Sequence, residues 1–206
     1  MDPVIVLASN NPGKLAELRT ILTEAIPSLQ PDQIVDADTV NAPDVVEDGI
    51  TFEDNALKKA TETARATGLI AVADDSGLAV DVMNGAPGIF SARWAGKHGD
   101  DQANLELLLA QLADIDATHR GASFVCAAAL ATPDGSTRRV EMGRLAGDLT
   151  FEPRGEHGFG YDPILEIPHL GKTAAELDPK TKNELSHRGK AFRALASTLA
   201  GVLDKA

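Results

Sequence analysis

Hydrophobic and polar positions follow two patterns along the chain, and together they predict a mixed α/β fold. Apolar runs over residues 4–8 and 69–73 have the length and continuity of buried strands. Elsewhere apolar residues recur three and four positions apart, as they do on one face of a helix. These helical sets are Leu15, Leu18 and Leu22, then Ala56, Leu57, Ala60 and Ala64, then Leu105, Leu108, Leu109 and Leu112, and last Phe192, Leu195, Leu199 and Leu203.

Polar residues beside these segments predict where the helices begin and end. Thr51, with Asp54 three residues later, is expected to cap the second helix, and Gly68 is expected to end it. Asp100 and Asp101 are expected to start the third helix. The last apolar stripe predicts a C-terminal helix of about 17 residues.

A β-hairpin follows the third helix in this prediction. Residues 124–132 and 137–142 are joined through the turn Pro133-Asp134-Gly135-Ser136. No long Ser, Gly or Pro linker divides the chain, so we expect one domain over residues 1–206. Because helices and a hairpin are mixed, the sheet is expected to be mixed and covered by helices rather than purely parallel.

An acidic tetrapeptide interrupts the apolar pattern. Asp74-Asp75-Ser76-Gly77 follows the run at 69–73, and an apolar run resumes at 78–82, which predicts a turn at a strand end where ligands collect in α/β proteins. Neighbouring side chains on an extended chain point to opposite sides, so one carboxylate is expected to bind a metal or orient water while the other anchors the turn. An Asx turn that only satisfies backbone donors is the alternative.

The first loop has the features of an anion site. Residues 9–13 lead into a helix start, where backbone N–H groups and the helix dipole favour an anion, and Lys14 would stand beside it. Ser9 and Asn11 add side-chain donors, and Gly13 permits close backbone approach. The segment lacks the Gly-Lys-Ser/Thr ending of a Walker loop. An ordinary capped helix with a surface Lys14–Glu17 pair is the alternative.

Three further segments carry candidate chemistry. Residues 153–163 gather three glycines around two aromatics, which suits a planar ligand, and a tight turn that packs the two aromatics into the core is the alternative. Lys182 and residues 186–189 place cations before and at the start of the last helix, either toward a ligand or toward solvent. Glu47-Asp48-Gly49 offers a further carboxylate before the second helix, or a solvated loop.

Composition and charge narrow the function. The chain has 206 residues, 43% of them hydrophobic, which is sufficient for one sizeable core. The formal net charge of −12 repels DNA and RNA, so no nucleic-acid polymer is expected as a partner. A small polyanion can still bind where a few cations converge and a divalent metal adds positive charge.

Neither a membrane span nor a secretory leader is expected. No apolar run reaches the length of a bilayer-spanning helix, and Met1-Asp2-Pro3 lacks the features of a signal peptide. We therefore expect no membrane partner and a cytoplasmic location. The only cysteine, Cys126, lies in an apolar stretch and is expected to be a buried small hydrophobe.

Taken together, these segments resemble the inosine triphosphate pyrophosphatase family, also called XTP/dITP diphosphatases or non-standard purine NTP pyrophosphatases. The resemblance covers nearly the whole chain and rests on six motifs in order. They are Ser9-Asn10-Asn11-Pro12-Gly13-Lys14 with Glu17, Thr51-Phe52-Glu53-Asp54-Asn55-Ala56, Ala73-Asp74-Asp75-Ser76-Gly77-Leu78, Gly85-Ala86-Pro87-Gly88 with Ser91-Ala92-Arg93, Gly158-Phe159-Gly160-Tyr161-Asp162-Pro163, and Ser186-His187-Arg188-Gly189.

The resemblance implies a fold, an activity and an assembly. The fold would be an elongated mixed β-sheet flanked by helices, with two lobes around a central cleft. The activity would be magnesium-dependent hydrolysis of ITP, dITP or XTP to the monophosphate and pyrophosphate, which cleanses the nucleotide pool. The protein would be a homodimer.

The resemblance also implies roles for single residues. Asp75 would be the catalytic acid/base or a metal-binding carboxylate. Phe159 would stack on the purine, and His187 and Arg188 would recognise the base. The substrate-binding residues implied in this way are Ser9, Asn10, Asn11, Pro12, Gly13, Lys14, Ser76, Phe159, Gly160, Tyr161, Asp162, Lys182, His187 and Arg188.

The metal-binding segment departs from the family pattern. Where the family often has Glu-Glu-Thr-Gly, this chain has Val46-Glu47-Asp48-Gly49, so Glu47 and Asp75 are the metal-ligand candidates, and Asp48 either moves the ligand or adds one. Only Lys59 of the pair Lys58-Lys59 aligns with the family's usual lysine, and both stay outside the catalytic set.

The expected reaction is attack of a water linked to Asp75 on the α-phosphorus. Whether Asp75 takes the proton or only positions the metal is open. One alternative is a pyrophosphatase for pyrimidine or modified nucleotides, such as the Maf-like proteins. Another is a nucleotide-binding sensor without catalysis, against which the joint presence of Lys14, Glu47 and Asp75 argues.

Overall fold

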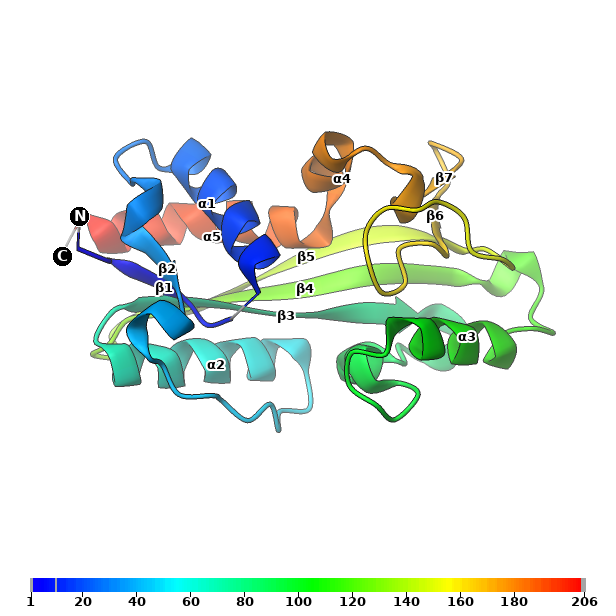
Figure 1. Cartoon of the computed structure of the whole chain (residues 1–206), viewed down its shortest axis with the longest axis horizontal. Coiled ribbons are helices and arrows are strands. Elements are labelled where there is room, and N and C mark those ends of the chain that lie inside the picture. Colours follow the sequence, from blue (N-terminus) through cyan, green and yellow to red (C-terminus); the bar gives the residue numbers. More distant parts are fainter. Residues whose placement is uncertain (1, 10, 205–206) are drawn as a thin grey trace. The chain divides into compact units, whose positions relative to one another are not determined.

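The computed structural model describes residues 2–9 and 11–204. Within these residues, seven strands form one sheet in the order β2-β1-β3-β4-β5-β6-β7 (Figure 1). The strands are β1 (Ile5–Leu7), β2 (Ile34–Asp36), β3 (Ile70–Val80), β4 (Gly121–Ala131), β5 (Arg138–Leu149), β6 (Leu165–Ile167) and β7 (Lys172–Thr173). The α-helices are α1 (Pro12–Ala25), α2 (Phe52–Thr67), α3 (Asp101–Gln111), α4 (Pro179–Leu185) and α5 (His187–Leu203). Short 3₁₀ helices cover Pro31–Gln33, Asp38–Val40, Asp81–Met83, Gly88–Arg93, Ala117–His119 and Ala174–Glu176.

The sheet contains both parallel and antiparallel pairs. Strand β1 runs parallel to β2 and to β3, with Ile5 opposite Ile34 and Ile70. Strand β6 runs antiparallel to β5 and to β7. The prediction of a mixed sheet flanked by helices is therefore confirmed.

The chain divides into two compact units. The first comprises Met1–Asp75, Cys126–Gly143 and His187–Ala206, and the second comprises Ser76–Val125 and Arg144–Ser186. The elongated shape, the central cleft and the single domain over residues 1–206 stay predictions.

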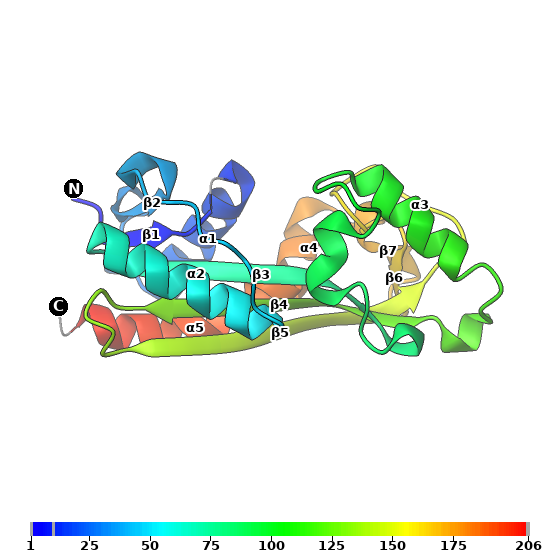
Figure 2. The ribbon, with the colours of Figure 1, turned by 90° about the horizontal axis from the view of Figure 1, so that it is seen from below.

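The first unit has a core on each side of its part of the sheet. On one side Ile70 and Val72 pack with residues of α1 and α5, among them Leu18 and Phe192. On the other side the alternate residues of β3 pack with the alanine face of α2, in a cluster that includes Ala71, Ala73, Ala56, Ala60 and Ala64. Figure 1 shows α1 and α5 together on one side and α2 on the other, and Figure 2 shows α2 lying over β3.

Local capping explains where the first two helices begin. The Asn11 side-chain oxygen Oδ1 accepts hydrogen bonds from Gly13 N at 2.9 Å and from Lys14 N at 3.3 Å, so Asn11 is the N-cap of α1. Thr51 Oγ1 accepts a bond from Asp54 N at 3.0 Å at the start of α2. The helix ends at Gly68, whose φ of 72° lies in the left-handed region. The predicted bounds of α2 are therefore confirmed.

The acidic turn predicted at residues 74–77 is wrong. Strand β3 is continuous from Ile70 to Val80, so the two carboxylates lie within the strand rather than after it. Read alone, four small or polar residues between apolar runs have the composition of a turn. In the fold, the two carboxylates bond to side chains of helices that flank the sheet, Asp74 to Lys14 and Arg188 and Asp75 to Asn55. The strand can therefore continue through these polar residues.

The second unit has a core of its own. Its cluster contains Leu78 of β3 and Leu165 of β6. The same cluster contains Leu105 and Leu108 of α3 and the C-cap of that helix, Leu112. The predicted start and apolar face of α3 are confirmed, with Asp100 as the N-cap.

The predicted hairpin is also confirmed. Thr132 N donates to Thr137 O at 3.1 Å, and β4 and β5 are longer than their apolar runs suggest. The sequence pattern missed β2, β6, β7 and α4, each of at most 7 residues. Elements this short carry too few periods for a hydrophobic pattern to reveal.

Two further expectations concern single features. Cys126 is fully buried, as predicted. Within residues 2–9 and 11–204, none of the helices has both the length and the apolar character that a membrane span requires.

Candidate active site

A buried carboxylate organises the polar residues of the first unit. Asp74 is only 1% exposed, and its two side-chain oxygens lie 2.9 and 3.0 Å from Lys14 Nζ. Arg188 Nε donates to Asp74 Oδ2 at 3.1 Å, and Arg188 Nη1 lies 3.3 Å from Glu17 Oε2. Strand β3 thus joins the start of α1 to the start of α5 through charge pairs.

The pKa values of Asp74 and Arg188 are shifted by the charges that surround them in the protein. Burial alone would raise the pKa of Asp74, but Lys14, Arg188 and Lys59 hold that pKa well below its usual value. Burial would likewise lower the pKa of Arg188, and the carboxylates of Asp74 and Glu17 raise it instead. Asp74 and Arg188 therefore stay ionised at neutral pH.

Lys59 of α2 adds a third cation to this group. Its Nζ donates to the backbone oxygen of Asp74 at 2.5 Å and to Glu47 Oε1 at 2.8 Å. Burial disfavours its charge, but Asp74, Glu47 and Asp75 together raise the pKa of Lys59. Its neighbour Lys58 pairs with Asp48 at 2.5 Å, where both side chains are more exposed. Of the two lysines, only Lys59 belongs to the candidate site.

Asp75 has different partners from Asp74. Asn55 Nδ2 of α2 donates to Asp75 Oδ2 at 2.9 Å, and Asn55 Oδ1 accepts from Gly49 N at 2.8 Å. A side chain at Gly49 would meet Asn55 Oδ1 at 2.7 Å, so this contact requires glycine. Asn55 therefore ties the loop that carries Glu47 to the strand that carries Asp75.

The electrostatic setting of Asp75 is the opposite of that of Asp74. Burial raises the pKa of Asp75 and is the largest cause. The Asn55 hydrogen bond and the charge of Lys59 lower this pKa, the charges of Glu47 and Asp74 raise it further, and the net shift is upward. A carboxylate with a raised pKa beside a second carboxylate is suited to accept a proton or a cation.

The residues present fit a magnesium ion that also binds substrate phosphates. No group of three or more His, Cys, Asp or Glu side chains is placed to hold a metal within the described part of the chain. Magnesium, however, is commonly held by one or two carboxylates together with phosphate oxygens and waters. Glu47 and Asp75 provide two such carboxylates, and their repulsion would fall when a cation binds between them.

In the first loop, the Lys14 ammonium group is a better candidate for binding an anion than the backbone N–H groups of residues 13 and 14. Because Asn11 Oδ1 accepts from both Gly13 N and Lys14 N, these two N–H groups are already bonded. Ser9 Oγ accepts from Asn11 N at 3.2 Å. Asn10 lies outside the described residues, and Pro12 is the first residue of α1.

The second unit contains a separate group of predicted site residues. Phe159 is 64% exposed, and Lys182 Nζ of α4 lies 5.4 Å from the centroid of its ring. Asp162 Oδ2 accepts from Lys182 Nζ at 2.6 Å and from Phe159 N at 2.8 Å. A side chain at Gly158 would meet Asp162 Oδ2 at 2.2 Å, so the loop can close around Asp162 only with glycine there.

The two aromatics of this loop have different surroundings. Tyr161 is 5% exposed, belongs to the core of the second unit, and donates from its hydroxyl to Ser91 O at 2.9 Å. Burial raises the pKa of Tyr161, so the hydroxyl keeps its proton. Phe159 is therefore the ring available for stacking, and Tyr161 anchors the loop to the core of the second unit.

The structure thus brings the predicted residues together in two groups. In the first unit, Asp74 and Lys59 link four of them by the contacts above, namely Lys14, Glu47, Asp75 and Arg188. Phe159, Asp162 and Lys182 are linked in the second. Ser76 lies half-buried in β3, and His187 lies half-buried at the first position of α5. One shared pocket for both groups stays a prediction.

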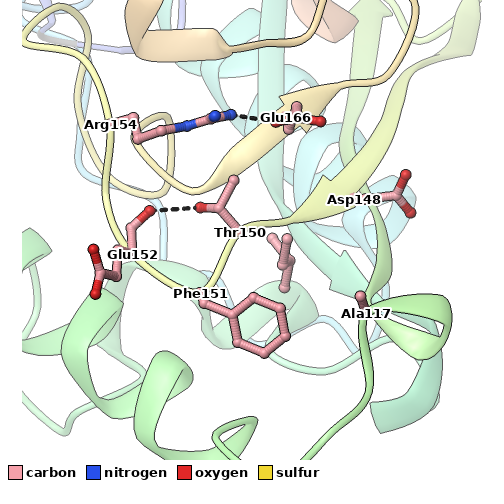
Figure 3. Close-up of a pocket in the computed structure, with 8 residues that line it drawn as sticks. Ala117, Asp148, Thr150, Phe151, Glu152, Arg154 and Glu166 are labelled. Atoms are coloured by element: carbon pink, nitrogen blue, oxygen red, sulfur yellow. Dashed lines mark hydrogen bonds and ion pairs between the residues drawn. The ribbon is translucent and has the colours of Figure 1, made fainter.

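A pocket of about 570 Å³ in the second unit contains none of these residues (Figure 3). Its lining includes Phe151, Asp148 and Glu152, and Figure 3 shows the two carboxylates pointing away from each other. Arg154 pairs with Glu166 across it. Its lining contains the carboxylates of Asp148, Glu152 and Glu166 and an arginine that is already paired, and this excess of negative charge disfavours a triphosphate.

Comparison with known proteins identifies the family. The model of the Ham1 family matches residues 5–198. The chain belongs to the Ham1 family. A relative from Streptomyces coelicolor named dITP/XTP pyrophosphatase is 60% identical over 200 residues, covering 97% of this chain and 98% of the relative.

Solved structures of Ham1-family proteins share the fold. A HAM1 protein from Coxiella burnetii superposes with a TM-score of 0.85 at 42% identity, covering 97% of this chain and 99% of that one. A Mycobacterium abscessus protein, titled nucleoside-triphosphatase and dITP/XTP pyrophosphatase, has a TM-score of 0.76 at 51% identity, covering 95% and 98%.

Sequence reasoning missed two residues of this Ham1-family site. Asn55 stands in the second motif without an assigned role, and Lys59 stays outside the predicted catalytic set although it aligns with the family's usual lysine. A signal for Asn55 existed, since an asparagine on the apolar side of a helix has to satisfy its amide. For Lys59 only the three-dimensional contacts with Glu47 and Asp74 decide the role.

Proposed function

We propose that the chain hydrolyses non-standard purine nucleoside triphosphates, namely ITP, dITP and XTP, to the monophosphate and pyrophosphate. One observation carries this proposal: the chain is 60% identical, over 97% of its length, to a protein named dITP/XTP pyrophosphatase. The charge arrangement of the first unit supports it, because cations gather there around two adjacent carboxylates of contrasting pKa.

In this proposal the first group of residues handles the triphosphate. Lys14 and Lys59 offset phosphate charge, and Asp74 keeps both ammonium groups in place. Ser9, Asn11 and Ser76 are proposed as further contacts. Asp75, held by Asn55, orients the attacking water and accepts its proton or hydrogen bond.

Magnesium is proposed as the cofactor. Glu47 and Asp75 would hold it, and when bound it would supply Lewis-acid stabilisation of charge on the phosphates. Glu47 also bonds Lys59, so the same carboxylate would be shared between an ammonium group and the ion.

The second group is proposed to bind the base. Phe159 would stack on the purine. Lys182 carries only donors, which suits the 6-oxo oxygen of hypoxanthine or xanthine and leaves an adenine 6-amino group without an acceptor. His187 and Arg188 are proposed to assist base recognition from the start of α5.

The proposed setting is the cytoplasm and the proposed assembly is a homodimer. The dimer is tested by light scattering, where a particle of twice 21.6 kDa is expected. A particle of 21.6 kDa at working concentration would contradict it.

The activity is tested by product analysis. Purified protein is given ITP, dITP, XTP, ATP, GTP and dTTP with magnesium, and pyrophosphate, phosphate and the monophosphate are quantified. We expect pyrophosphate from ITP, dITP and XTP. Release of phosphate alone would contradict attack at the α-phosphorus, a preference for dTTP would favour the pyrimidine alternative, and no turnover at all would favour the sensor.

Asp75→Asn tests the assignment of the catalytic carboxylate in the same assay. Loss of a general base typically lowers the rate by about 10²- to 10⁴-fold, and we expect a loss in this range. Full activity in this variant would remove Asp75 from its proposed role.

A further inference from the structure

The loop that carries Phe159 is held by a carboxylate from a distant element. Gly160 N donates to Asp101 Oδ2 at 2.9 Å, and Asp101 is the first residue of α3, 59 positions earlier in the chain. Both residues belong to the second unit. None of the six sequence motifs contains Asp101.

Two successive backbone N–H groups of this loop donate hydrogen bonds to carboxylates. Phe159 N donates to Asp162 Oδ2 at 2.8 Å, and the next N–H, that of Gly160, donates to Asp101. Gly160 has a φ of 60°, in the left-handed region, so the chain turns sharply between the two bonds. With both peptide groups fixed, the Cα–Cβ direction of Phe159 is fixed as well.

Asp101 also stands near the residue that follows Gly160. After burial, the charge of Asp101 is the second cause that raises the pKa of Tyr161. The neutral Tyr161 hydroxyl donates to Ser91 O at 2.9 Å. The loop is therefore supported by Asp101 on one side and by the 3₁₀ helix Gly88–Arg93 on another.

Asp101 is not required to cap its own helix. The N-cap of α3 is Asp100, whose side chain accepts from Ala103 N at 3.3 Å. Asp101 is exposed, and its side chain accepts the hydrogen bond from Gly160 N. Of these two adjacent aspartates, Asp100 therefore caps α3, and Asp101 bonds the loop that carries Phe159.

We propose that Asp101 is a positioning residue for base binding, because its bond to Gly160 sets the direction of the Phe159 ring. This inference rests on the proposed function, in which Phe159 stacks on the purine. In the proposed function the first group of residues handles the phosphates, and Asp101 belongs to the second unit, so its loss is expected to affect how tightly substrate binds rather than how fast it reacts.

Steady-state kinetics with dITP and magnesium test the proposal. Asp101→Ala is expected to raise KM about tenfold, the size of effect expected for one hydrogen bond to a charged acceptor, and to change kcat less than about twofold. Asp101→Asn keeps an acceptor oxygen and is expected to restore KM to within about threefold of the unsubstituted protein. Asp100→Ala removes the cap of the same helix and is expected to leave KM unchanged.

A second measurement does not depend on catalysis. With ¹⁵N-glycine labelling, the amide proton of Gly160 is expected to exchange with solvent about tenfold faster in Asp101→Ala, and at close to its original rate in Asp101→Asn. If the unsubstituted protein fails to hydrolyse dITP, the proposed function fails, while this exchange measurement still reports on the Asp101–Gly160 bond.

Several results would overturn the inference. An unchanged KM in Asp101→Ala, an equal rise in KM in Asp100→Ala, or an Asp101→Asn variant as impaired as Asp101→Ala would each do so. Unchanged Gly160 exchange in Asp101→Ala would remove its structural basis.

Discussion

Lys14 Nζ lies 2.9 and 3.0 Å from the two carboxylate oxygens of Asp74, a residue that is only 1% exposed. The ammonium that is proposed to meet the phosphates is therefore held by a carboxylate from inside the protein. Because Arg188 bonds the same carboxylate at 3.1 Å, one buried charge positions groups from both α1 and α5. Three residues from remote parts of the chain thereby act as a unit.

Substitution of Asp74 is expected to destabilise the fold. In Asp74→Asn, Lys14 and Arg188 lose their buried counter-charge, and breaking a buried ion pair in this way costs about 3–5 kcal/mol of unfolding free energy. Chemical denaturation at pH 7 measures this change. Asp44→Asn, at an exposed position, is the control and should leave the midpoint unchanged. A wild-type midpoint in Asp74→Asn would contradict the role of the pair.

The stability from Asp74 is expected to depend on pH in one direction. Its pKa is lowered from the ordinary value of 3.8, so its contribution is fully present above that pH and is lost as the pH falls further toward the lowered pKa. Between pH 5 and pH 2 the unsubstituted protein should lose stability more steeply than Asp74→Asn. Parallel curves from denaturant titrations at each pH would show that Asp74 does not contribute.

Asn55→Ala is expected to shift the pH dependence of activity. Asn55 lowers the pKa of Asp75 through its 2.9 Å hydrogen bond, so its removal raises that pKa and more of Asp75 is protonated at a given acidic pH. The acid limb of the kcat/KM profile should therefore move to higher pH. Glu53→Gln, exposed on the same helix, is the control. An unmoved limb would separate Asn55 from the ionisation that governs activity.

The adjacent lysines of α2 are expected to differ in effect. Lys59→Ala removes the ammonium between Glu47 and Asp74 and should lower kcat/KM about 100-fold, comparable to the loss of one preorganised electrostatic donor. Lys58→Ala breaks the more exposed pairs with Asp48 and Glu62 and should leave kcat/KM within about twofold of normal, since surface pairs contribute little. Similar losses of kcat/KM in both variants would argue against a specific role of Lys59 in the candidate site.

Phe159→Ala is expected to weaken substrate binding without unfolding the protein. Stacking of an aromatic ring on a base contributes about 1–3 kcal/mol, so KM for dITP should rise about 5- to 150-fold. The ring is 64% exposed, so the thermal midpoint should change little. Phe151→Ala, in the pocket of Figure 3, is the control for an exposed aromatic of the same unit. If Phe151→Ala raises KM and Phe159→Ala does not, the base binds elsewhere.

The fold was predictable where its signals are local. Leu15, Leu18 and Leu22 mark α1 by their spacing, and the cap at Thr51 with the stop at Gly68 marks both ends of α2. The turn predicted at residues 74–77 failed because composition alone does not distinguish polar residues in a loop from carboxylates paired within a strand.

The amino-acid sequence by itself determined the periodic helices, the hairpin, the family and most of the candidate residues, because spacing, capping and short motifs act within a few neighbouring positions. Only the tertiary structure decided which cation meets which carboxylate. Asp74 is 60 positions from Lys14 and 114 from Arg188, and the lowered pKa of Asp74 beside the raised pKa of Asp75 depends on these partners. Burial and charge pairing are set by how distant segments pack, and no local pattern in the chain encodes that.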